Sequence, residues 1–323
     1  MFTVSDELYS AAMIAVRDCM GTVAGEKVLV VTDEPLRPIG YALFAASRDL
    51  DTETMLVEIR PRASNGAEPP APVAEMMKAV DVVLCPTSKS LTHTDARRAA
   101  SAAGARVGTL PGVTEAIMVR CMNADYHRIA ERTFSLCALL ERSSVVRVKA
   151  PSGTDVTMPI AGRQAHASSG LFRQKGQWGN LPTGEAYLAP LEGRSQGVVV
   201  VDGSMAGVGL TKTPIRITVK DGYAEAIEGG AEADRLIALL EPHGRDARTV
   251  AEFGIGTNDK AILTGVILED EKVMGTIHIA FGDNKSMGGS VRVASHLDGL
   301  IRRPTVWLDE MKIMEDGRLL VAD

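Results

Sequence analysis

The chain has 323 residues, which is enough for one large domain or two ordinary ones with a substantial buried core. Hydrophobic residues make up 45% and charged residues 24%, an ordinary balance that excludes disordered, coiled-coil and collagen-like architectures. Aromatic residues make up only 4% and the formal net charge is -6, so the sequence has neither the stacking side chains nor the basic surface of a nucleic-acid-binding protein.

The cysteines and the apolar runs indicate the expected cellular setting. Four scattered cysteines form no C-x-x-C pair, which argues against a zinc knuckle and against a disulfide framework: Cys19, Cys85, Cys121 and Cys137. The N-terminal segment lacks the basic start and long apolar core of a signal peptide, and no apolar run is long enough to cross a bilayer. We therefore expect a cytoplasmic protein that is not bound to a membrane.

The first third of the chain alternates between helical and strand-like segments. Ser5 precedes apolar residues at helical spacing, which predicts a capped amphipathic helix. Apolar runs predict buried strands at residues 27–32, 54–59, 81–85 and 106–109, and helical patterns lie at 39–46, 73–80 and 95–103. This alternation predicts a parallel sheet with helices on both faces.

The pattern of apolar and polar residues changes after a long helix predicted at residues 126–141. Short alternating segments predict strands at 145–150, 155–160, 197–203, 215–222, 275–284 and 305–310, with one helix at about 231–240. We therefore predict two domains, an α/β domain at residues 1–143 and a β-rich, mixed α+β domain at residues 144–323 that carries a metal site.

The turn after the first predicted strand argues against a nucleotide cofactor. Residues 33–37 read DEPLR, which is acidic and contains no glycine, so this turn cannot wrap a pyrophosphate as a glycine-rich loop does. No organic cofactor is expected.

Candidate metal ligands gather in the second domain. His278 lies in the strand-like segment GTIHIAFGDN, and His296 and Asp298 follow in SHLDG. Residues two apart on a strand face the same side, so His296 and Asp298 are expected to point together. Two imidazoles and a carboxylate can hold zinc, cobalt, manganese or iron(II), although a His-x-Asp pair can also be an ordinary surface pair.

Two glutamates strengthen the metal hypothesis. Glu185 lies in the loop-like segment GNLPTGEAYLAP, and Glu252 lies in AEFGIGTN between residues that look buried. A carboxylate among apolar neighbours is costly unless it is paired or bound to a metal.

These four segments, in this order, resemble the motifs of the aminopeptidase T and aminopeptidase S family of thermophilic-type metallo-aminopeptidases. The resemblance implies five metal ligands: Glu185, Glu252, His278, His296 and Asp298. It implies two divalent ions (zinc, cobalt or manganese) joined by a bridging carboxylate, and a metal-bound hydroxide that releases N-terminal amino acids from short peptides. It also implies that the α/β domain walls the cleft or forms part of a dimer, and we expect a homodimer.

One departure from that family concerns the residue seven positions after the strand histidine. The family has a tyrosine there, whereas this chain has Lys285. We expect Lys285 to donate to an oxyanion, or else to be a solvated loop residue. Asp283 in the same loop is a candidate for proton transfer or for supporting a ligand.

Two other hypotheses remain open. A ring-cleaving dioxygenase for 2,5-dihydroxypyridine is also similar to this family, and an iron(II) held by His278, His296 and Asp298 would satisfy its facial triad. Because a mononuclear site does not need Glu185 and Glu252, their presence favours the dinuclear hydrolase. The third hypothesis is a non-catalytic metal-binding relative. His166, in GRQAHASSG, is an additional candidate for the substrate pocket.

Overall fold

The structure is a computed structural model and describes residues 4–321. The chain divides into two compact units, the first formed by Met1–His127 and Gly170–Thr183 and the second by Arg128–Ser169 and Gly184–Asp323. A single boundary near residue 143 is predicted from the sequence, whereas the chain leaves the first unit within helix α6 (Tyr126–Glu141) and returns to it once. The returning segment carries a short strand, β8 (Trp178–Asn180), that completes the first unit's sheet.

The first unit contains a five-stranded parallel sheet in the order β2-β1-β3-β4-β8. Its other strands are β1 (Lys27–Asp33), β2 (Glu53–Ile59), β3 (Val82–Cys85) and β4 (Arg106–Thr109). The four strands predicted for this region are present, and the predicted parallel α/β layer is confirmed.

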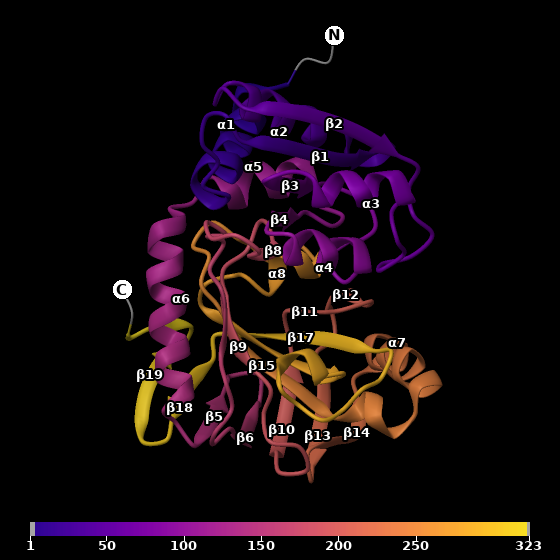
Figure 1. Ribbon diagram of the computed structural model, residues 1–323. Coiled ribbons are helices and arrows are strands. Elements are labelled where there is room, and N and C mark those ends of the chain that lie inside the picture. Colours follow the sequence, from indigo (N-terminus) through magenta and orange to yellow (C-terminus); the bar gives the residue numbers. More distant parts are fainter. Residues whose placement is uncertain (1–3, 322–323) are drawn as a thin grey trace. The chain divides into compact units, whose positions relative to one another are not determined.

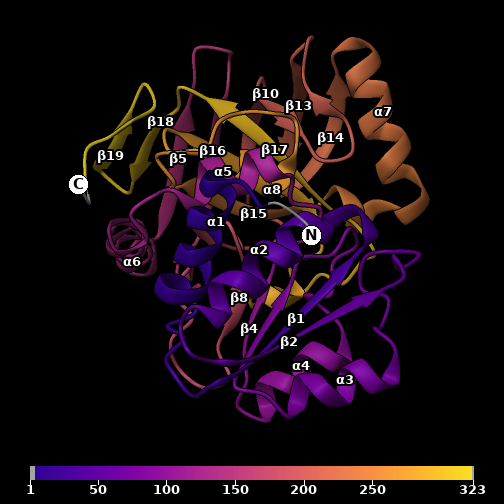
Figure 2. The same ribbon diagram turned by 90° about the horizontal axis from the view of Figure 1, so that it is seen from above.

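Helices cover both faces of this sheet, as Figures 1 and 2 show. They are α1 (Asp6–Met13), which continues as a π-helix (Ile14–Cys19), α2 (Arg37–Arg48), α3 (Ala71–Lys78), α4 (Asp95–Ala102) and α5 (Glu115–Met122). Helices α3 and α4 pack against Leu29 and Val31 of β1. Val28 and Val30 point to the opposite face, on which α2 packs.

Two local features of the first unit follow from single side chains. Ser5 caps α1 as predicted, since the backbone N–H of Leu8 donates to its hydroxyl at 3.2 Å. At the end of β1, one carboxylate oxygen of Asp33 accepts hydrogen bonds from the backbone N–H and the hydroxyl of Ser88 at 2.8 and 2.6 Å. A 3₁₀-helix (Glu34–Leu36) then leads directly into α2, so no glycine-rich loop forms at this turn.

The second unit contains two antiparallel sheets. The eight-stranded sheet has the order β14-β13-β10-β6-β5-β18-β19-β20. Its strands are β5 (Val145–Lys149), β6 (Asp155–Pro159), β10 (Gln196–Val201), β13 (Ile215–Lys220), β14 (Tyr223–Glu228), β18 (Thr305–Leu308), β19 (Met311–Glu315) and β20 (Arg318–Leu319).

The seven-stranded sheet has the order β12-β11-β17-β16-β15-β9-β7. Its strands are β7 (His166–Ser168), β9 (Glu185–Leu188), β11 (Ser204–Met205), β12 (Gly209–Leu210), β15 (Val250–Gly256), β16 (Thr276–Gly282) and β17 (His296–Arg302). Two further helices belong to this unit, α7 (Gly230–Leu240), which lies beside β13 and β14 in Figure 1, and the short α8 (Ile267–Asp270).

One hydrophobic core fills the second unit. Side chains of the eight-stranded sheet, such as Val148 and Ile217, belong to the same buried cluster as Phe253 and Ile279 of the seven-stranded sheet. Alternation along β15 and β16 therefore directs every second residue into this core and the intervening residues to the opposite face. The mixed fold of both units agrees with the predicted fold class. In the described part of the chain, no helix combines the length and the apolar character needed to cross a membrane.

Candidate metal centre

The five predicted ligands come from four neighbouring strands of the seven-stranded sheet. Glu185 begins β9, Glu252 lies in β15 and His278 in β16, while His296 and Asp298 lie in β17. These strands are adjacent in the order β17-β16-β15-β9. Residues separated by more than one hundred positions in the sequence are therefore brought onto one short stretch of sheet.

The side chains share the face that points away from the core. Ile277 and Ile279 belong to the core, so His278 between them points outward. Leu297 packs against the same core, which leaves His296 and Asp298 on the outer face. The expectation that these two residues point together is confirmed, because His296 Nε2 lies 3.4 Å from Asp298 Oδ1.

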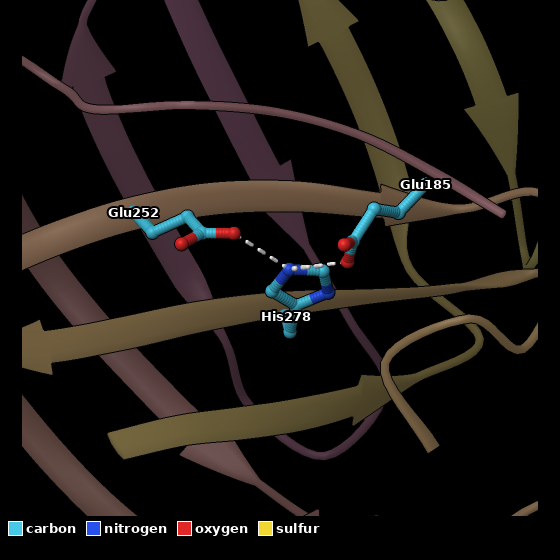
Figure 3. A group of neighbouring side chains, drawn as sticks. All are labelled: Glu185, Glu252 and His278. Carbon is cyan, nitrogen blue, oxygen red and sulfur yellow. Dashed lines mark hydrogen bonds and ion pairs between the residues drawn. The ribbon is translucent and has the colours of Figure 1, made fainter. Parts of the chain in front are cut away.

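Glu252 occupies the centre of the cluster. Its Oε1 lies 3.0 Å from His278 Nε2, and its Oε2 lies 3.2 Å from His296 Nε2. Figure 3 shows the carboxylates of Glu252 and Glu185 on either side of the His278 imidazole, with Glu185 Oε2 3.6 Å from Nε2. One buried carboxylate thus holds both imidazoles.

The cluster consists of two overlapping groups that share Glu252. In each group, one ligand atom per residue lies within 4.8 Å of the others, and the groups are Glu185–Glu252–His278 and Glu252–His296–Asp298. The His278 side chain is fully buried, whereas that of His296 is 31% exposed. The group around His296 is therefore the one that is partly open to solvent.

The charges in the cluster fit a divalent cation. Burial alone would lower the pKa of His278, but the hydrogen bond to Glu252 and the nearby carboxylates raise it to about 9. The pKa of His296 is likewise raised well above its usual value, because Asp298 and Glu252 outweigh its burial. Burial alone would raise the pKa of Glu252, but its two imidazole partners lower it. Protons on the imidazoles thus supply positive charge that a bound metal ion would supply instead.

The backbone of Asp283 orients His296. The Nδ1–H of His296 donates to the Asp283 carbonyl oxygen at 2.7 Å, which directs Nε2 toward the carboxylates. Metal-binding histidines commonly use their other ring nitrogen in this way. The Asp283 carboxylate accepts the backbone N–H groups of Lys285 and Val293, each at 3.2 Å, and so shapes the loop that precedes β17.

Lys285 lies in a 3₁₀-helix (Lys285–Met287) and is exposed. Within residues 4–321, its side chain forms no hydrogen bond or ion pair with the five clustered residues. Its role as an electrophile stays a prediction, as does that of the Asp283 carboxylate in proton transfer.

A lysine that the motifs did not include completes the cluster. The Nζ of Lys272 lies 2.6 Å from Glu185 Oε1 and also forms an ion pair with Glu271, and its side chain is only 3% exposed. Burial alone would lower the pKa of Lys272, but these two carboxylates raise it above its usual value. The run of acidic residues around a single lysine in ILEDEKV is the only sequence signal for this contact.

The absence of a side chain at Gly254 leaves space for the His278 ring. It pairs with His278 across β15 and β16, and a Cβ atom at this position would lie 2.0 Å from His278 Nε2. The imidazole lies directly over the glycine, so any other residue would displace it.

His166 lies near the Glu185 end of the cluster. It pairs with Tyr187 across β7 and β9, and the two rings stack with centroids 5.3 Å apart. Burial and the nearby Glu185 carboxylate raise the pKa of Tyr187. The buried His166 Nε2 has no hydrogen-bond partner among the described residues, which is uncommon for a buried polar atom.

The protein thus combines an α/β unit with a unit of two antiparallel sheets, and the second unit carries a cluster of side chains that could hold a metal ion. The sequence profile of the 2,5-dihydroxypyridine 5,6-dioxygenase family matches residues 13–321. The chain belongs to this family.

One curated relative carries the same description, and two solved structures share the fold. The 2,5-dihydroxypyridine 5,6-dioxygenase of Pseudomonas putida strain KT2440 is 22% identical over 205 residues, which span 59% of this chain and 59% of the relative. The structure of 2,5-dihydroxypyridine dioxygenase from the same strain matches with a TM-score of 0.85 at 18% identity, covering 99% of each chain. AmpT from Thermus thermophilus matches with a TM-score of 0.71 at 18% identity, covering 98% of this chain and 99% of AmpT.

These findings correct the functional prediction. The chain was expected to be a metal-dependent hydrolase, specifically an aminopeptidase, and this expectation is wrong: both the family profile and the curated relative indicate a dioxygenase. The likeness to AmpT is a likeness of fold. The prediction failed because imidazole and carboxylate side chains suit both reaction classes, so the residue types alone do not separate a hydrolase from a dioxygenase.

Proposed function

We propose that this protein is an iron(II)-dependent dioxygenase that cleaves the ring of a dihydroxylated pyridine or a closely similar heteroaromatic compound. The family match over residues 13–321 is the observation that carries this proposal. The cluster on the seven-stranded sheet supports it, because a mixed set of imidazoles and carboxylates suits iron(II).

The proposed iron ligands are Glu252, His296 and Asp298, the group on the accessible side of the cluster. This set differs from the triad inferred from the sequence, since His278 is grouped with Glu185 and Glu252. In our proposal, His278 holds the second oxygen of Glu252 and so fixes that carboxylate. Bound iron(II) supplies the one-electron chemistry that lets dioxygen react with an aromatic ring.

The chain's own residues would orient the substrate. The stacked rings of His166 and Tyr187 offer a flat surface of the kind that a planar heteroaromatic ring contacts. The unpartnered His166 Nε2 retains the capacity for one hydrogen bond, which a ring hydroxyl group could satisfy. We expect His166→Ala to raise KM for the ring substrate more than it lowers metal content.

Turnover of 2,5-dihydroxypyridine tests the proposal. Protein loaded with iron(II) without oxygen is mixed with this compound in aerated buffer, and loss of ring absorbance is followed together with oxygen uptake. We expect equimolar consumption of both, and none with His296→Ala. Full iron occupancy in folded protein, with no oxygen uptake on dihydroxylated pyridines, would contradict the proposal and favour a non-catalytic metal-binding protein.

A further inference from the structure

We propose that the ammonium group of Lys272 takes the place of a second metal ion and limits the centre to a single ion. This inference concerns the same metal centre as the proposed function and rests on that function in no other respect. It explains why a chain with five ligand-type side chains needs no second cation.

Lys272 is fixed in position by its surroundings. Its Nζ contacts Glu185 and Glu271, and its backbone N–H donates to the Glu269 carbonyl at 2.9 Å. Its carbonyl oxygen accepts the backbone N–H of Asn258, also at 2.9 Å. The segment also packs closely over β15, since a Cβ atom on Gly256 would lie 2.2 Å from the next carbonyl oxygen. This lysine is therefore a buried and fixed member of the cluster rather than a mobile surface side chain.

The contact with Glu185 distinguishes the two overlapping groups. In the group Glu185–Glu252–His278, the lysine already donates to one of the carboxylates. A divalent ion bound there would lie against a second cation on the same glutamate, with repulsion that burial strengthens. In the group Glu252–His296–Asp298, none of the ion pairs among the described residues involves a lysine. One ion is therefore expected, and it is expected in the second group.

Removing the ammonium group should convert the centre from one that binds a single ion into one that binds two. Met is close to Lys in length but carries no charge, so Lys272→Met would free Glu185 and leave one more uncompensated negative charge. In a two-metal site, one carboxylate can lie between the neighbouring ions and bind both. Glu252 already stands between the two groups in this way.

The experiment counts manganese(II) ions in the full-length protein without substrate. The metal-free wild type, Lys272→Met, Lys272→Met/Glu185→Gln and Lys149→Met, a control at an exposed lysine paired with Asp155, are equilibrated with manganese(II) and measured by elemental analysis and electron paramagnetic resonance. We expect about one ion in the wild type and the control, and about two spin-coupled ions in Lys272→Met. The double variant should return to about one ion, since it lacks the freed carboxylate.

A single substitution keeps the test decisive if Lys272→Met does not fold. Because Lys272 rather than metal holds Glu185, Glu185→Gln in the wild-type chain should still bind about one ion. Loss of that ion, two ions in the wild type, or one ion in folded Lys272→Met would each overturn the inference. These counts do not depend on turnover, so failure of the proposed dioxygenase reaction would be seen separately.

Discussion

At the scale of single residues, the centre depends on one carboxylate. Glu252 is almost completely buried and meets both imidazoles, so its two oxygens join the fully buried His278 to the accessible His296. A buried charge of this kind is stable only while its partners remain in place. The same dependence makes Glu252 the most sensitive position of the cluster.

Glu252→Gln should lower the affinity for iron(II) or manganese(II) by about 100-fold or more, because it removes a ligand charge and the anchor of both imidazoles. Calorimetric titration of the metal-free protein measures this. Glu315→Gln, which changes an exposed carboxylate paired with Lys312, should leave the affinity unaltered. Equal metal affinities for the two variants would show that Glu252 is not a ligand.

A second glutamate should make stability depend on pH. Glu192 accepts the backbone N–H of Ser290 at 2.7 Å and the amide of Asn284 at 2.9 Å, and it pairs with Arg163. Burial alone would raise the pKa of Glu192, but these partners lower it to about 2. Since the folded-state pKa lies below the unfolded value, the stabilisation is present above about pH 4.5 and is lost as the pH falls toward 2.

Glu192→Gln should therefore destabilise the protein by about 1.5–3 kcal/mol at neutral pH, the usual value of hydrogen bonds to a charged group. Denaturant unfolding of both proteins at pH 7 and at pH 4 measures the difference, which should be smaller at pH 4. A difference that is the same at both pH values would mean that the negative charge of Glu192 does not stabilise the folded protein.

At the scale of secondary-structure elements, the site is a property of neighbouring strands. Each of β9, β15, β16 and β17 contributes at least one ligand-type residue, and the strand alternation aims them all away from the core. The close pairing of β15 and β16 leaves space for the His278 imidazole only because Gly254 has no side chain.

Gly254→Ala should push the His278 ring away from Glu252. The new Cβ atom would lie 2.0 Å from Nε2, so we expect weaker metal binding and a loss of about 1–3 kcal/mol of stability, as overpacking usually causes. Gly108→Ala is a suitable control, because its Cβ atom would meet Met20 Sδ at 3.0 Å within the first unit, whereas the five clustered residues belong to the second unit. Metal affinity that falls equally in both variants would indicate a general packing defect rather than displacement of His278.

Sequence patterns predict some elements closely and miss others for identifiable reasons. Helix α6 and strand β4 have the predicted ends, since each has a clear apolar period. Strand β15 was not predicted, because VAEFGIG contains two glycines and a glutamate, residues that are uncommon in strands. Gly254 leaves space for the His278 ring, Gly256 leaves space for the Val273 carbonyl oxygen, and Glu252 belongs to the cluster. Glu185 was expected in a loop but begins β9.

The predicted ligands do lie together, but their chemistry could not be inferred from residue types. Five motif residues gather on one sheet face, as the resemblance to the peptidase family implied. The lysine that binds Glu185 comes from the segment after α8, and only the folded chain brings it to β9. Without this contact, the ligand count favoured two ions and a hydrolase.

At the scale of the whole molecule, the first unit depends on a segment that follows it by many residues. Strand β8 extends the parallel sheet beyond β4, pairing Val107 with Trp178. The Trp178 ring also packs under the Arg97 guanidinium, whose carbon lies 3.8 Å from the ring centroid. The α/β unit therefore cannot be separated from the chain at residue 143 without losing part of its sheet.

A fragment of residues 1–143 should fold poorly, because it leaves the edge of β4 unpaired and exposes the apolar surface that β8 covers. Circular dichroism and size-exclusion chromatography of this fragment should show a broad thermal transition and association into larger particles. A monomeric fragment with a sharp, cooperative transition would show that residues 170–183 are dispensable for the first unit.

The proposed dioxygenase reaction is the central claim, and oxygen labelling tests it most directly. Iron-loaded protein is given 2,5-dihydroxypyridine under ¹⁸O₂, and the product is analysed at once by mass spectrometry. Ring cleavage by a dioxygenase should place both labelled oxygen atoms in one product molecule. A product without label, whose new oxygen atoms come from water, or an unchanged ring with iron fully bound, would contradict the account.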